Sequence, residues 1–142
     1  MKAARVTLVL LAAGLWSSTA MAQGMDSLIA AAQRAAGAFR RHDFRAFVGG
    51  TDLVAVVLPG GSGTAPLPGA QAAQVLSTFA EGAIERTVEV TVARMVDTDR
   101  AYIELQREFT ARGGGSPRIQ TLYVGLRRDG SGFRVAEVRI VP

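Results

Sequence analysis

The side chains best suited to binding chemistry lie in the C-terminal part of the chain, at two-residue spacing. Tyr102, Glu104 and Gln106 alternate in one segment, and Tyr123 and Arg127 share one parity in the next. Residues two apart on a strand point to the same face, so each set projects together. Tyrosine and arginine are enriched at binding interfaces. We therefore expect these five residues to form a ligand or interface face, and the pattern assigns no catalytic residue.

Nucleophilic and metal chemistry lack the residues that they need, because the chain has one histidine and no cysteine. His42 follows an apolar helical pattern, where an imidazole would cap the last carbonyls and complement the helix dipole. Asp97 and Asp99 form the one close acidic pair that could suit calcium. Aspartate is also a preferred turn residue, and we favour the turn. We expect no metal site and no cofactor.

The stretch "LPGGSGTAPLPG", residues 58–69, could be taken for a phosphate-binding loop. A Walker loop ends in lysine followed by serine or threonine, whereas this loop leads into alanine and glutamine. A dinucleotide fingerprint opens directly into a helix, which Pro66 and Pro68 would prevent. We expect an extended spacer and no nucleotide binding.

Apolar spacing predicts three helices. A long amphipathic helix is expected from Asp26, as its N-cap, to about His42. Asp43 is placed to cap a short second helix over 44–48, and a third helix is expected to begin near Ala70.

Strands are predicted between and after these helices. The β-branched run 52–58 predicts a buried strand. From Glu85 onward the apolar period becomes two, and turns rich in aspartate and glycine divide the rest into a four-stranded meander whose later strands cover 101–112, 118–128 and 133–141. Helices that precede and pack on an antiparallel sheet make an α+β domain.

This order of elements resembles the nuclear transport factor two-like superfamily. In addition, "LPGGSG", "QAAQVLSTF", "AYIEL" and "VAEVRIV" are similar to motifs of a family of exported bacterial proteins, domain of unknown function 4783. The resemblance spans nearly all of residues 23–142. It implies a cone-shaped, cystatin-like fold with N-terminal helices on a curved antiparallel sheet, and an exported location, but no particular activity.

The N-terminus has the pattern of a signal peptide. Lys2 and Arg5 precede the apolar run 6–16, which is shorter than the roughly 20 residues of a membrane span. Ala20 and Ala22 then place small residues where signal peptidase cleaves. We expect cleavage after Ala22, which leaves a single periplasmic or extracellular domain at 23–142 without a membrane anchor.

The charge pattern argues against nucleic-acid binding. The formal net charge is +4, and arginines alternate with acids instead of clustering, as in "EFTAR" and "VDTDR". A nucleic-acid face needs a basic patch, so we expect no nucleic-acid partner.

Two classes of function remain. The first is a non-enzymatic binding or interaction module of the cell envelope, homodimeric through its sheet. The second is a small isomerase- or dehydratase-like enzyme acting on an apolar ligand in the cone pocket, as the resemblance to ketosteroid isomerase-like proteins implies. A carboxylate aimed into an apolar cavity beside a tyrosine hydroxyl would favour the enzyme. A cone filled by Phe, Leu and Val side chains would favour the binding module.

The leader pattern generates a direct prediction. N-terminal sequencing of protein recovered from its native compartment should begin at Gln23, because the small-residue site precedes that position. Protein that retains Met1 in a membrane fraction would contradict export with cleavage.

Overall fold

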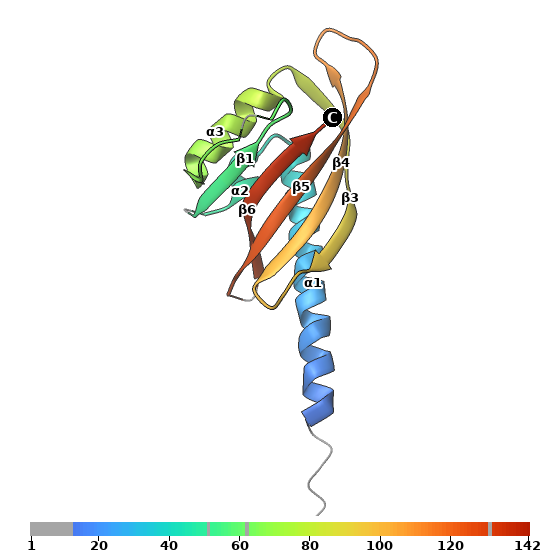
Figure 1. The fold of residues 1–142 in the computed structure, drawn as a ribbon. Coiled ribbons are helices and arrows are strands. Elements are labelled where there is room, and N and C mark those ends of the chain that lie inside the picture. The colour runs from blue at the N-terminus through green and yellow to red at the C-terminus, as the bar shows by residue number, and fades with distance from the viewer. Residues whose placement is uncertain (1–12, 51, 62, 131) are drawn as a thin grey trace, which may run out of the picture.

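The computed structural model describes residues 13–50, 52–61, 63–130 and 132–142 (Figure 1). In chain order the elements of these residues are α1 (Ala13–Arg40), α2 (Phe44–Val48), β1 (Leu53–Val57), β2 (Leu67–Pro68), α3 (Gly69–Ala80), β3 (Ala83–Met95), β4 (Arg100–Ala111), β5 (Arg118–Asp129) and β6 (Gly132–Val141). The strands form one sheet in the order β2-β1-β6-β5-β4-β3. The domain is α+β, as predicted.

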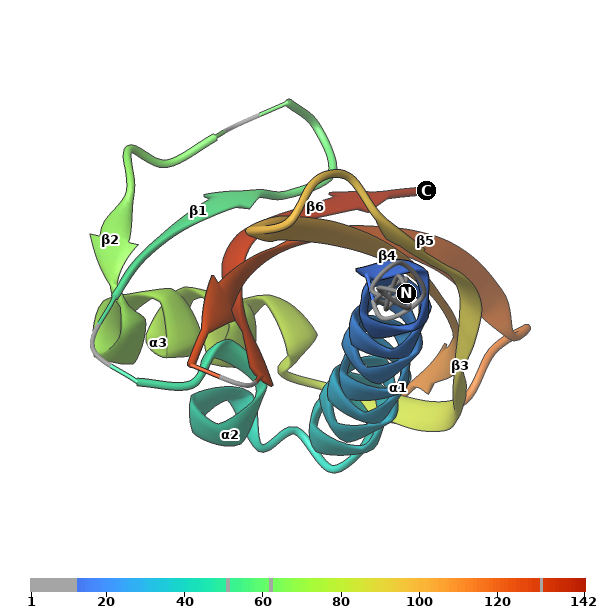
Figure 2. The same cartoon turned by 90° about the horizontal axis from the view of Figure 1, so that it is seen from below.

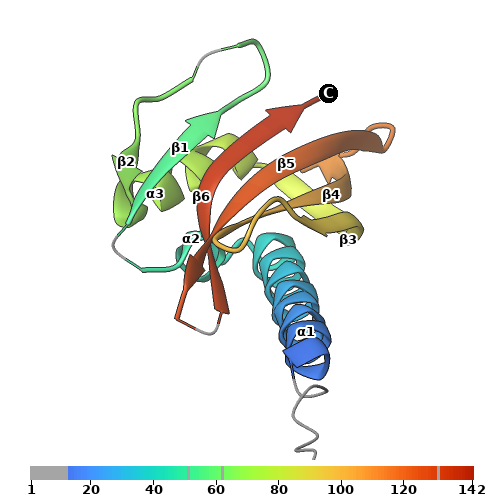
Figure 3. The same ribbon diagram turned by 60° about the horizontal axis from the view of Figure 1, so that its bottom comes forward.

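The sheet is mixed. Strands β3 to β6 form the predicted antiparallel meander. β1 joins its edge parallel to β6, with Val56 opposite Val138, so segments far apart in the sequence lie side by side (Figure 3). β2 then pairs with β1 in the antiparallel sense. The sheet curves strongly, and α1 lies within its concave side (Figure 2).

Helix α1 begins earlier than expected. Asp26 lies inside the helix and does not cap it, because the helix already runs from Ala13 through alanine, serine, methionine and glutamine residues that tolerate helical backbone. From Met21 onward, Leu28 is the first buried residue. The expected cleavage point after Ala22 therefore falls before the part of α1 that enters the core. Residues 1–12 of the predicted leader lie outside the described residues.

No helix among the described residues is long and apolar enough to span a membrane.

The two shorter helices lie beside α1 on the same side of the sheet (Figure 2). The Asp43 carboxylate accepts a hydrogen bond from the backbone N–H of Ala46, which confirms the predicted cap of α2. The Phe39 ring of α1 meets the rings of Phe44 and Phe47 edge to face, at centroid distances of 5.2 and 5.4 Å. α3 buries one face against the same core, with Leu76 fully enclosed.

The glycine-rich segment is extended at its end, where Leu67 and Pro68 form β2. Its middle folds back onto β1 and is not a plain spacer. The Thr64 N–H donates to the Val56 carbonyl (2.9 Å), and the Thr64 hydroxyl accepts from the Val56 N–H (3.1 Å). Thr64 therefore satisfies backbone groups of β1, which is a structural role for this loop.

The core lies between α1 and the concave face of the sheet. Alternate residues of the meander point into it, including Ala101, Ile103 and Leu105 of β4 and Leu122, Val124 and Leu126 of β5. The residues between them therefore face outward. Arg107 is the one charged residue among the described residues that is buried as a whole.

Candidate functional site

The five predicted residues lie on the outer, convex face of the meander. Tyr102, Glu104 and Gln106 alternate along β4, and Tyr123 and Arg127 lie on β5. In the sheet register Glu104 is opposite Tyr123. The face is outward because the alternate positions of both strands are buried in the core.

The two tyrosines form the centre of this face. Their rings are nearly parallel, with centroids 6.2 Å apart and planes inclined by 19°. The Tyr102 hydroxyl donates a 2.6 Å hydrogen bond to the Glu104 carboxylate. The Arg94 guanidinium of β3 lies 5.0 Å from the Tyr102 ring centre, a cation–π distance. These contacts hold the aromatic surface in one orientation.

A shallow hollow of about 430 Å³ lies beside the rings. Its lining residues come from β4, β5 and β6: Tyr102, Tyr123, Gly125, Glu137, Arg139 and Val141. Gly125 has no side chain, so it leaves room between its neighbours. We call this hollow and the two tyrosines the tyrosine groove.

The structure does not gather all five predicted residues at this groove. Gln106 is exposed further along β4. Arg127 lines a separate hollow with Asp52, Leu53 and Arg134. Tyr102, Glu104 and Tyr123 form one cluster, and the other two residues flank it.

Burial and the hydrogen bond to Glu104 both raise the pKa of Tyr102 above its usual value. Burial is the larger cause, because it disfavours the charged phenolate. The hydroxyl is therefore a protonated donor over the physiological range, and it does not act there as a base.

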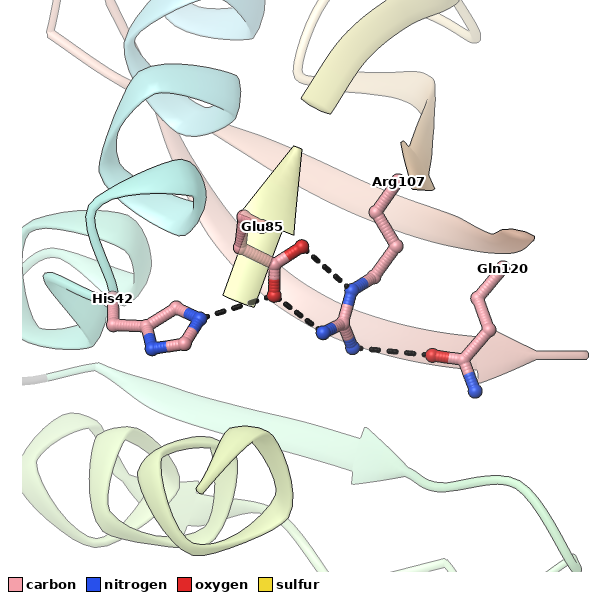
Figure 4. A network of polar contacts seen from close by, with 4 residues as sticks. All are labelled: His42, Glu85, Arg107 and Gln120. Atoms are coloured by element: carbon pink, nitrogen blue, oxygen red, sulfur yellow. Dashed lines mark hydrogen bonds and ion pairs between the residues drawn. The ribbon is translucent and has the colours of Figure 1, made fainter. Parts of the chain in front are cut away.

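The interior of the cone contains a polar network that the sequence analysis did not identify (Figure 4). Arg107 of β4 and Glu85 of β3 pair through both carboxylate oxygens, with Arg107 Nε 3.0 Å from Glu85 Oε2 and a second, short bond from Nη2 to Oε1. Each side chain is only 1% exposed. Arg107 Nη1 donates to Gln120 Oε1 of β5 (3.1 Å), and His42 Nε2 lies 3.0 Å from Glu85 Oε1.

Three aromatic rings enclose the Arg107 guanidinium. Its central carbon lies 4.0 Å from the ring centre of Phe109, 5.2 Å from Phe39 and 5.7 Å from Phe79. Rings that face a cation stabilise it. Among the described residues, no buried side-chain nitrogen or oxygen lacks a hydrogen-bond partner. The network is therefore satisfied without a ligand.

The expected role of His42 as a cap of the helix carbonyls is wrong. Its backbone leaves α1 at a positive φ of 56°, and its imidazole is directed to Glu85. A carboxylate is a stronger acceptor for this ring than a helix carbonyl.

Asp97 and Asp99 lie in a turn, as the sequence analysis predicted. Asp97 Oδ1 accepts from the backbone N–H groups of Asp99 and Arg100, each at 2.8 Å. The Asp99 N–H is the largest cause that lowers the pKa of Asp97, followed by the Arg100 side chain. No group of three metal-ligating side chains occurs among the described residues.

Comparisons with known proteins identify the fold. No protein-family model matches the chain, and no curated protein matches it. The chain is similar to the crystal structure of a ketosteroid isomerase-like protein from Erwinia carotovora atroseptica, with a TM-score of 0.67 and 21% identity over 82% of this chain and 94% of that one. It is also similar to an NTF2-like protein with a cystatin-like fold from Novosphingobium aromaticivorans, with a TM-score of 0.65 and 14% identity over 94% of this chain and 90% of that one.

A DUF4783 family protein from Bacteroides uniformis is also similar, with a TM-score of 0.62 and 12% identity over 77% of this chain and 94% of that one. These likenesses confirm the expected NTF2-like fold and the resemblance to the domain of unknown function 4783. At such identities they establish the fold alone.

The arrangement of the acids and tyrosines bears on catalysis. Both tyrosines of the chain lie on the outer face, so neither enters the cone. Glu85 does enter it, but Arg107 neutralises its charge. Within the part of the chain that the structure describes, the interior therefore lacks the unpaired carboxylate beside a tyrosine hydroxyl that the enzyme hypothesis requires.

The buried ion pair generates a stability prediction. Glu85→Gln should lower the free energy of unfolding by about 3–5 kcal/mol, because it leaves Arg107 buried without its counter-charge. Urea unfolding would measure the loss. Glu108→Gln is the matched control, since Glu108 pairs with Arg86 at the surface (3.6 Å) and should cost less than about 1 kcal/mol. Equal, small losses in both variants would contradict the role of the pair.

The raised pKa of Tyr102 generates a prediction about pH. Tyr123→Phe leaves Tyr102 as the only tyrosine. The absorbance of its phenolate should then appear with a midpoint above the usual tyrosine pKa of about 10. Folding favours the neutral phenol of Tyr102. Its contribution to the free energy of unfolding is therefore fully present below the pKa of the unfolded state and is lost as the pH rises through the pKa of the folded state. Adding Glu104→Ala should lower the midpoint. A midpoint in folded Tyr123→Phe at or below that of the urea-unfolded protein would refute the assignment.

Proposed function

We propose that the chain is a non-enzymatic interaction module of the cell envelope that forms a homodimer through the outer face of its sheet. The observation that carries the proposal is the tyrosine groove. No described helix covers this face of β4, β5 and β6, whereas α1 fills the opposite face (Figures 1 and 2). Residues of the kind enriched in interface cores are thus displayed where no other part of the described chain packs on them.

A second copy of the chain is the partner that the surface chemistry favours. In a two-fold interface the same patch must be complementary to itself. The outer face contains both signs of charge, Arg94 and Arg139 beside Glu104 and Glu137. A two-fold axis through the tyrosine groove would bring opposite charges together and allow a ring of one copy to occupy the hollow of the other.

Sheet packing supports this geometry. Two sheets pack face to face at a separation of about 10 Å, with their side chains interdigitated. The groove of about 430 Å³ provides room for such interdigitation at the centre of the face. Aromatic side chains that fill such central positions contribute most of the binding energy in protein interfaces.

The alternative, an isomerase- or dehydratase-like enzyme, finds less support. It requires a carboxylate that can exchange protons with a ligand in the cone. Glu85 is held by Arg107, and most of the other residues that point into the core are apolar. Export of the chain, with cleavage after Ala22, is also part of the proposal, and only the leader pattern supports it.

Sedimentation velocity tests the proposed dimer. Gly125→Arg places a long cation in the middle of the groove. The position tolerates a side chain, because Gly125 does not have a positive φ and a Cβ there would meet its nearest neighbour at 3.5 Å, an ordinary contact. We expect the parent protein to sediment as a dimer and Gly125→Arg as a folded monomer. Tyr102→Ala should weaken association in the same direction.

Ser77→Arg on the exposed side of α3 is the matched control, since it adds the same charge and bulk away from the sheet. It should remain dimeric. A parent protein that is monomeric at all concentrations, or a dimer that is unchanged by Gly125→Arg, would exclude the proposed interface.

A further inference from the structure

A second hollow lies on the other side of the sheet from the tyrosine groove. It has a volume of about 280 Å³ and is formed by α1, α2 and the ends of β5 and β6. Its apolar lining includes Phe47, Leu126, Phe133 and Val135, and its polar lining includes Arg34 and Arg134. This hollow is separate from the proposed dimer interface, because none of these residues lines the tyrosine groove.

Two carboxylates near this hollow form ion pairs with the same arginine. Arg134 Nη1 donates to Asp52 Oδ2 (2.8 Å), and Arg134 Nη2 makes a short bond to Asp129 Oδ2. The guanidinium also packs against Gly50, where a Cβ would approach its nitrogen to 2.7 Å. Arg134 is therefore a fixed part of the wall, and neither aspartate is available to neutralise another cation.

Two further arginines have no carboxylate partner among the described residues. Arg34 lines the hollow from the exposed side of α1. Arg128 donates to the carbonyl of Thr98 (2.6 Å), and its guanidinium lies 4.9 Å from the ring centre of Phe133. The charged residues that line the hollow are Arg34, Arg134 and Asp129. Because Asp129 is bonded to Arg134, Arg34 is the cation of the lining that is left for an anionic ligand.

We propose that this hollow binds a small monocarboxylate with a compact apolar body. The carboxylate would pair with Arg34 at the rim, and the apolar body would rest on Phe47 and Phe133. An apolar lining with a few polar groups that fix orientation is the usual composition of a small-molecule site. The volume equals about nine water volumes, which suits a single aromatic ring or a short branched chain with its carboxylate.

The charge sign is the decisive property of the site. A ligand of the same size that carries an ammonium group would be repelled by Arg34, which has the same charge. Asp129, the one acid in the lining, is already bonded to Arg134. The site should therefore discriminate between a carboxylate and an amine with the same apolar body.

NMR titration of the uniformly ¹⁵N-labelled protein tests this with phenylacetate and 2-phenylethylamine as probes. Phenylacetate should shift the backbone amides of Phe47, Gly49 and Phe133 saturably, and the amine should not. The affinity for phenylacetate should fall with added salt, because the recognition is partly electrostatic.

Variants separate the site from general charge effects. Arg34→Gln should weaken phenylacetate binding about fivefold, the effect of one partly exposed ion pair. Arg40→Gln, at another exposed arginine of α1 that does not line the hollow, should leave affinity unchanged. Ala46→Leu should block binding by filling the hollow. Equal binding of the amine, no shift of these amides by phenylacetate, or unchanged affinity in Arg34→Gln would overturn the proposal.

Discussion

The buried ion pair between Glu85 and Arg107 fixes how the long helix and the curved sheet pack together. Two charges that are each 1% exposed are tolerable only together, because each would otherwise lose its hydration without compensation. The pair joins β3 to β4, Gln120 extends it to β5, and His42 attaches the end of α1. One network of polar contacts within the apolar core therefore holds the long helix and the curved sheet in a fixed arrangement.

The two faces of the sheet differ in their chemistry. Inside, the acid that enters the cone is neutralised, and three phenylalanine rings enclose its partner. Outside, Tyr102 and Tyr123 lie beside a groove, and the Glu104 carboxylate accepts a hydrogen bond from the Tyr102 hydroxyl. The convex face is therefore the one that we propose for association with a second copy, and the paired acid argues against catalysis inside the cone.

Most of the fold was predictable because burial imposes periods that the sequence displays. The helices and the meander follow from apolar spacings of 3.6 and two, and the Asp43 cap and the Asp97 turn follow from local hydrogen bonding. The parallel pairing of β1 with β6 was not predictable, because no local pattern specifies a partner so distant in sequence. The start of α1 was missed because a capping residue such as Asp26 is also tolerated inside a helix. Arg107 shares its parity with Ile103 and Leu105, a signal that could have placed it inside. Glu85 has the parity of the exposed Thr87, and only the register shift between Glu85 and Thr87 turns it inward.

Isotope-filtered NMR on a mixture of labelled and unlabelled chains would test the proposed dimer interface, since it detects only contacts between copies. We expect intermolecular NOEs from the ring protons of Tyr102 and Tyr123 to Val141 and other outer-face residues of the second copy. Intermolecular contacts confined to α1 or α3, or none at concentrations at which the protein is fully dimeric, would contradict it.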